Sequence, residues 1–218
     1  MPQAPGDAIP VHSVQEEYFY MMVHACPCGG AWAGRSQQVE NAGASLRHEV
    51  TARCARCGAE QTLRFELAAP GPGAAPPTAI REINPTDEPS RALDLVEWMQ
   101  LGRFYLERIG RLREPLERAQ SLLDARQCLE EALKFYGPGD DGPPPRALWS
   151  DASRAKAAEQ PALYSRAGLA AMLDRMPPMK ELRKVDAPEQ KAFEKAVRRE
   201  AEKRVGKWWQ FWKRWRGG

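Results

Sequence analysis

Two short cysteine turns decide the fold: residues 26–30 read CPCGG and residues 54–58 read CARCG. They hold four of the five cysteines in the chain. Zinc takes four ligands in a tetrahedron, and a tight turn that carries two thiolates supplies half of that geometry. The glycine after the second cysteine of each turn can adopt a positive φ angle, so that backbone N–H groups point at the sulfurs. The pattern predicts one metal site, with Cys26, Cys28, Cys54 and Cys57 as its ligands.

The two turns resemble those of the zinc-ribbon family, in which two cysteine turns pin a small three-stranded sheet. The resemblance covers residues 18–67, and CARCG is its specific part. It implies one structural Zn²⁺ in a closed four-thiolate site. The first turn departs from the family pattern, because one residue rather than two separates Cys26 from Cys28. Two alternatives therefore stay open: a ligand set in which His24 replaces a sulfur, and reduced structural cysteines without a metal.

Residues 15–67 are predicted to form this zinc-ribbon-like module. The apolar run 18–23 suits a buried strand, although its length alone does not exclude a helix. Residues 46–52 and 61–67 alternate like half-buried strands, with a turn near residues 41–43. A module of about fifty residues buries too little apolar surface to fold well alone, so we expect metal binding to be coupled to its folding.

The flanks of the module are predicted to be irregular. Residues 1–14 are expected to form a disordered leader. Residues 68–77 read AAPGPGAAPP, which cannot hold a helix or a central strand. We therefore assign residues 68–83 as a linker and place the domain boundary there.

Residues 84–182 are predicted to form a mainly helical domain, which makes the fold class α+β. Apolar side chains recur at three- and four-residue spacing through residues 90–136, which predicts an antiparallel helical hairpin. Residues 137–150 predict a loop, and residues 165–176 predict a short helix. Cys128 lies on an apolar helical face, so we expect a small buried side chain rather than a reactive thiol.

The C-terminal stretch 187–218 predicts a long amphipathic helix. Residues 191–218 carry ten Lys or Arg against three acidic residues. The expected contact residues are Trp208, Trp209, Phe211, Trp212, Lys213, Arg214, Trp215 and Arg216. An aromatic face with basic flanks suits docking on a protein and attachment to an anionic membrane surface. Nucleic acid, bound through phosphates and base stacking, is a less favoured partner.

No catalytic constellation is recognisable in the sequence. None of the histidines His12, His24 and His48 stands in a motif with a Ser, Cys or carboxylate partner. We therefore expect a non-enzymatic zinc-binding adaptor or scaffold that makes protein–protein contacts. The alternative is a nucleic-acid-binding regulatory protein, but residues 15–70 carry five Arg against six Glu and are not strongly basic.

The sequence also favours a cytoplasmic protein. The N-terminus lacks the basic residues and apolar run of a secretory signal, and no stretch offers the roughly 20 apolar residues of a spanning helix. Paired cysteines in such a chain indicate metal binding in a reducing compartment rather than disulfides. If the C-terminal helix binds lipid, the protein would be peripheral at the inner membrane surface. The oligomeric state stays open.

Overall fold

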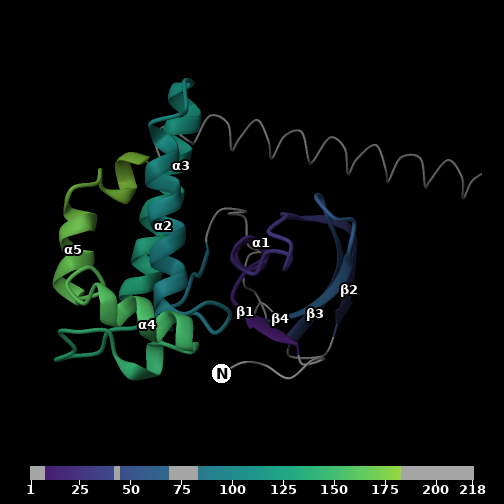
Figure 1. Cartoon of the computed structure of the whole chain (residues 1–218), viewed down its shortest axis with the longest axis horizontal. Coiled ribbons are helices and arrows are strands. Elements are labelled where there is room, and N and C mark those ends of the chain that lie inside the picture. The colour runs from purple at the N-terminus through teal and green to yellow at the C-terminus, as the bar shows by residue number, and fades with distance from the viewer. Residues whose placement is uncertain (1–7, 42–44, 69–82, 183–218) are drawn as a thin grey trace, which may run out of the picture.

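A four-stranded sheet forms the N-terminal part of the fold (Figure 1). The computed structural model describes residues 8–41, 45–68 and 83–182. Its strands are β1 (Ile9–Val11), β2 (Trp32–Asn41), β3 (Ser45–Cys54) and β4 (Glu60–Ala68), in the order β1-β4-β3-β2. Strands β2, β3 and β4 are antiparallel, whereas β1 pairs with β4 in parallel. The expected α+β class is confirmed, because a mainly helical region follows this sheet. The three-stranded module expected from the cysteine turns is wrong in its strand number, because β1 adds a fourth strand beside β4.

Alternation of side chains gives the sheet one apolar and one polar face. Val50 in β3 and its register partner Leu63 in β4 are buried, as are Phe65 and Leu67 further along β4. The intervening residues are mostly polar and lie on the opposite face, because successive side chains of a strand point to opposite sides. The alternation predicted for residues 46–52 and 61–67 thus corresponds to β3 and β4.

The strand predicted for residues 18–23 is wrong, because these residues belong to helix α1 (Val14–Val23). Ser13 is the N-cap, and its hydroxyl accepts a hydrogen bond from the backbone N–H of Glu16 at 3.1 Å. Glu16 and Glu17 occupy the first turn, where negative charge favours a helix. Aromatic residues favour strands only weakly, and the cap at Ser13 and burial of both helix sides outweigh that preference.

The disordered leader predicted for residues 1–14 is also wrong for its second half. Strand β1 pairs Ile9 with Phe65 and Val11 with Leu67, and both Ile9 and Val11 are buried. Pro10 is tolerated because β1 is an edge strand, where one row of backbone groups needs no partner in the sheet. Residues 1–7 lie outside the described part of the chain.

Between Leu95 and Asp174 the chain forms four α-helices. They are α2 (Leu95–Ile109), α3 (Pro115–Leu133), α4 (Asp151–Glu159) and α5 (Arg166–Asp174), with a 3₁₀ turn η1 (Pro145–Ala147) before α4. Helices α2 and α3 pack side by side in the range where the sequence predicts a hairpin. A Cβ at Gly102 would lie 2.8 Å from the Leu129 side chain, so the glycine allows this close packing. Helix α5 falls within residues 165–176, whereas α4 was not predicted.

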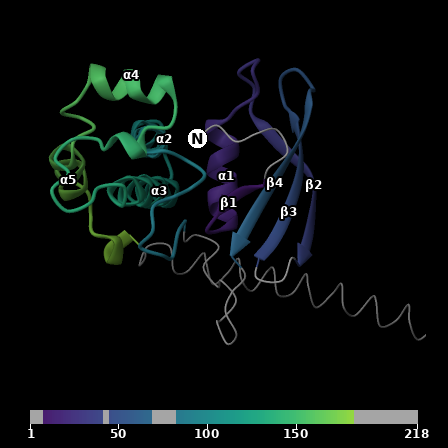
Figure 2. The ribbon, with the colours of Figure 1, turned by 90° about the horizontal axis from the view of Figure 1, so that it is seen from below.

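Helix α1 lies between the sheet and the other helices (Figure 2). On one side Phe19 is fully buried, with its ring centroid 5.7 Å from that of Trp98 and 6.0 Å from that of Tyr105. On the other side Tyr20 packs against Phe65 with the ring centroids 5.7 Å apart. The sheet and the helices therefore share α1 as a common layer of their cores.

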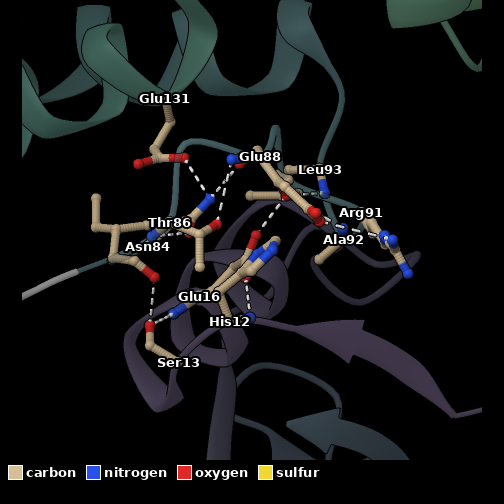
Figure 3. Close-up of polar contacts among 12 residues, drawn as sticks. His12, Ser13, Glu16, Asn84, Thr86, Glu88, Arg91, Ala92, Leu93 and Glu131 are labelled. Carbon is tan, nitrogen blue, oxygen red and sulfur yellow. Dashed lines mark hydrogen bonds and ion pairs between the residues drawn. The ribbon is translucent and has the colours of Figure 1, made fainter. Parts of the chain in front are cut away.

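Polar contacts reinforce this arrangement on one side of α1 (Figure 3). The hydroxyl of Ser90 donates a hydrogen bond to the buried Glu16 carboxylate. The side-chain amide of Asn84 donates to Glu131 of α3 at 3.1 Å. Residues 83–94 thus connect α1 with the helices. Of the predicted linker, residues 69–82 lie outside the described residues, while Ala68 ends β4 and Ile83 is buried.

Candidate metal centre

The four predicted cysteines lie together in one cluster. Their sulfur atoms are all within 4.8 Å of one another. Cys26 and Cys28 come from the connection between α1 and β2, whereas Cys54 ends β3 and Cys57 lies in the turn to β4. Cys26 and Cys54 are buried, Cys28 is half-buried and Cys57 is exposed. The β2–β3 hairpin brings the two turns together across 25 intervening residues.

Each turn is closed by its own backbone hydrogen bonds. In the first turn the N–H of Gly29 donates to the carbonyl of Cys26 at 2.7 Å, and Gly29 has a φ angle of 79°. In the second turn the N–H of Gly58 donates to the carbonyl of Cys54 at 3.1 Å, and Gly58 has a φ angle of 76°. The left-handed backbone is easily reached only by glycine. The shorter spacing of the first turn therefore still allows a closed turn.

Gly30 sets how closely the two turns approach. A Cβ at this position would lie 2.5 Å from the Cys54 sulfur and 2.6 Å from the Cβ of Arg56. Arg56 in turn donates a hydrogen bond from Nη1 to the carbonyl of Cys28 at 2.7 Å. The sequence shows two consecutive glycines in the first turn, but only the structure separates their roles. Gly29 supplies a backbone angle and Gly30 supplies space.

The sulfur geometry fits a tetrahedral metal ion. The sulfurs of Cys26 and Cys57 lie 3.6 Å apart, those of Cys28 and Cys54 lie 3.4 Å apart, and all four cysteines are free of disulfides. With zinc–sulfur bonds of about 2.3 Å, the sulfurs of a regular tetrahedron stand about 3.8 Å apart. The cluster is therefore consistent with a zinc-binding site, and little movement is needed to fill it.

Backbone N–H groups in the second turn favour the thiolate form that a metal requires. The hydrogen bond from the backbone of Cys57 lowers the pKa of the Cys54 thiol to about 6. The N–H of Arg56 also lies 3.4 Å from the Cys54 sulfur. The neighbouring thiols and burial instead raise the pKa values of Cys26 and Cys28, so the preference for the thiolate is that of Cys54 and not of the whole cluster. Four sulfur donors suit a soft or borderline cation, which binds cysteine as the thiolate.

His24 is not part of the four-sulfur cluster. Its Nε2 lies 3.6 Å from Oε1 of Glu97 in α2, and its ring packs at a tilt against that of Tyr20 with the centroids 4.1 Å apart. Its carbonyl accepts a hydrogen bond from the indole N–H of Trp32 at 2.8 Å. His24 therefore holds the first turn against α2 and β2 instead of completing the ligand set. Sequence reasoning missed this role, because Glu97 is distant along the chain.

The remaining predicted site residues are of two kinds. Cys128 is fully buried on α3, as expected, and burial raises the pKa of its thiol well above the usual range. The contact residues from Trp208 to Arg216, together with the whole predicted helix 187–218, lie outside the described residues. Within the part of the chain that the structure describes, no helix combines the length and apolar character needed to cross a membrane.

Comparison of the chain with protein-family models, with curated proteins and with solved structures found no match.

Proposed function

We propose that the protein is a non-enzymatic adaptor or scaffold whose N-terminal sheet is held in shape by one structural Zn²⁺. The observation that carries this proposal is the convergence of four thiols from two facing turns. A site with four thiolates is closed, because it leaves no coordination position for water or substrate. Its contribution is then to stability, by tying the start of β2 to the end of β3.

The charge pattern of the sheet favours a protein partner over nucleic acid. Opposite charges face one another in three register pairs of β3 and β4: Arg47 with Glu66, Glu49 with Arg64, and Arg53 with Glu60. One of them, Glu49 with Arg64, forms an ion pair at 3.0 Å. A surface that binds nucleic acid would carry a predominantly basic patch instead. The nucleic-acid alternative therefore rests on the basic segment 191–218 alone.

Strand β2 offers a second argument for a protein partner. It pairs with β3 on one side, and its other edge pairs with no strand among the described residues. An open edge presents backbone donors and acceptors that an extended segment of another chain can pair with. Val39 on this strand is 58% exposed, which adds an apolar contact.

Metal analysis of the purified full-length chain tests the zinc site. We expect about one zinc per chain, as a single four-thiolate site holds. Replacing Cys54 or Cys57 by Ser should release most of the metal. Cys128→Ala is the matched control, because this thiol is buried in α3 outside the cluster and its loss should leave the zinc content unchanged. Zinc-free protein from carefully reduced preparations would exclude the proposed site.

Flotation with liposomes tests where the adaptor attaches. The full-length chain is compared with a version that ends at Val205, using neutral and anionic vesicles at low and moderate salt. Flotation of the full-length chain alone, with anionic vesicles alone, would assign residues 207–216 to a membrane surface. Absence of flotation would leave these residues as a contact for protein. Mobility-shift assays with DNA and RNA on the same two chains would identify the nucleic-acid alternative.

A further inference from the structure

A cleft of about 460 Å³ lies on the side of α1 that faces the starts of α2 and α4. Its volume is within the range of small-molecule sites in proteins. The polar and aromatic side chains that line it include Tyr20, His24, Arg91, Glu97, Trp149 and Arg154. They come from three parts of the chain, which places the cleft at the junction between the sheet and the helices.

Two charged residues of the cleft are already used by the fold. Asp94 is the N-cap of α2, and its two oxygens accept hydrogen bonds from the backbone N–H groups of Glu97 at 3.0 Å and Trp149 at 3.2 Å. Arg154 donates to Asp151 at 2.6 Å and to the carbonyl of Leu148 at 2.9 Å. Both side chains already make these hydrogen bonds within the protein, so neither is a main contact for a ligand.

Glu97 retains a carboxylate oxygen that can accept from a ligand. Its Oε2 accepts the backbone N–H of Asp94 at 2.8 Å, which completes the capping box. Its Oε1 lies 3.6 Å from Nε2 of His24, which is too long for a hydrogen bond. The side chain is 18% exposed, and burial raises the pKa of the Glu97 carboxyl to about 7, so a bound ammonium group would favour its charged form. Tyr20 and Trp149 add aromatic surface beside it, which suits a cationic group.

Arg91 supplies the opposite charge at the same cleft. Its side chain is 67% exposed, and its ion pair with Glu88 is long, at 3.7 Å. A guanidinium held this loosely can turn toward a carboxylate at little cost. The cleft thus combines an inner carboxylate with a cation on an exposed, flexible side chain, and Ile9 and Ala92 provide an apolar wall.

We propose that this cleft binds a small zwitterion of the amino-acid class, with its ammonium group on Glu97 and its carboxylate on Arg91. An ammonium group donates three hydrogen bonds, and Glu97 accepts one of them at Oε1. The guanidinium of Arg91 matches the planar carboxylate. An apolar side chain of the ligand lies against Ile9 and Ala92. This site is separate from the metal centre and adds ligand binding to the proposed scaffold.

Calorimetric titration of the zinc-loaded full-length chain tests the proposal. The probes are the standard amino acids, followed by two analogues of the tightest binder, the N-acetylated form that lacks the ammonium group and the amine that lacks the carboxylate. We expect at least one amino acid to bind at millimolar concentration or below. Each analogue should bind more than about tenfold more weakly, because a charged group in the site loses its partner.

Two variants assign the contacts. Glu97→Gln keeps an N3 side chain that can complete the capping box but removes the charge. Arg91→Gln changes an exposed side chain, so the fold should be unaffected. Each should weaken binding by more than about tenfold, whereas the control Arg103→Gln, on α2 but outside the cleft, should not.

The proposal is overturned if none of the standard amino acids binds at millimolar concentration. It is equally overturned if both analogues bind as well as the parent amino acid, or if Arg91→Gln and Glu97→Gln bind like the unchanged chain. Zinc content is measured on each sample and only zinc-loaded protein is compared, because Tyr20 and His24 of the cleft lie next to the first cysteine turn.

Discussion

At the scale of single residues, the proposed metal centre depends on Gly30 as well as on its cysteines. The Cys54 sulfur and the Arg56 side chain stand where a Cβ of residue 30 would lie. Any larger residue must push the two turns apart, so the four sulfurs can no longer surround one ion. Because zinc ligands tolerate displacements of only a few tenths of an ångström, this position should be nearly as restrictive as a ligand.

Gly30→Ala should therefore lower zinc affinity by at least about tenfold, the size of loss seen when residues that support metal ligands are changed. Gly34→Ala is the matched control, because a Cβ there meets nothing within 4 Å. Competition with a zinc-binding dye measures both affinities. Equal affinities for the two variants would contradict the role given to Gly30.

The buried carboxyl of Glu17 should make the stability of the protein depend on pH. It is buried on α1, with Oε1 2.8 Å from Nδ1 of His48, and burial raises the pKa of its carboxyl to about 8. Burial also lowers the pKa of His48, so the pair is held without charge near neutral pH. In the unfolded chain Glu17 loses its proton near pH 4.5, so the free energy of unfolding falls as pH rises from about 4.5 to about 8.

Glu17→Gln should remove this dependence, because glutamine is neutral at every pH. The free energy of unfolding of the variant minus that of the unchanged chain should be larger at pH 8 than at pH 5. The expected increase is on the order of 2 kcal/mol. Urea unfolding at both pH values measures the difference. A gain of equal size at both pH values would show that Glu17 is not held protonated by the fold.

At the scale of elements, α1 joins the two halves of the molecule. Phe19 and Trp98 are both fully buried where α1 meets α2. Phe19→Ala should lower the free energy of unfolding by about 3–5 kcal/mol, the usual cost of such a cavity. Tyr18→Ala, at a neighbouring position that is 51% exposed, should cost much less. Urea unfolding of the two variants tests this, and similar costs would argue against α1 as a packed layer.

Elements with regular local patterns could be predicted from the sequence, whereas those fixed by distant partners could not. The alternation of apolar and polar residues in 46–52 and 61–67 predicts two strands, and these correspond to β3 and β4. Strand β1 has only three residues, and it is a strand because it pairs with β4 far along the chain. Helix α4 carries no apolar side chain larger than alanine and buries only Ser153 and Ala157, so it shows little periodicity.

The same limit applies to the site. The four cysteines were identified from spacing alone, because zinc chemistry demands those side chains in pairs. The contact of His24 with Glu97 and the lack of space at Gly30 arise from tertiary packing, which no short pattern records. For α1, the Ser13 cap and the acids that follow were a usable signal, and they outweighed the aromatic run.

At the scale of the whole molecule, the metal centre and the helices should not be independent. The first turn follows α1 directly, and His24 contacts α2 through Glu97. Removing the metal should therefore loosen α1 and the start of α2, while α5, which packs on α3, should be unaffected. Hydrogen exchange before and after chelation measures this. Faster exchange confined to the two cysteine turns would contradict the coupling.

X-ray absorption at the zinc edge of the full-length chain, loaded with one equivalent of metal, tests the four-thiolate site directly. Such a site should give four sulfur neighbours at about 2.3 Å and no nitrogen neighbour. A spectrum with three sulfurs and one imidazole nitrogen would contradict the closed four-thiolate site and return His24 to the ligand set. A spectrum dominated by oxygen at about 2.0–2.2 Å would show that the cysteine cluster does not hold the metal.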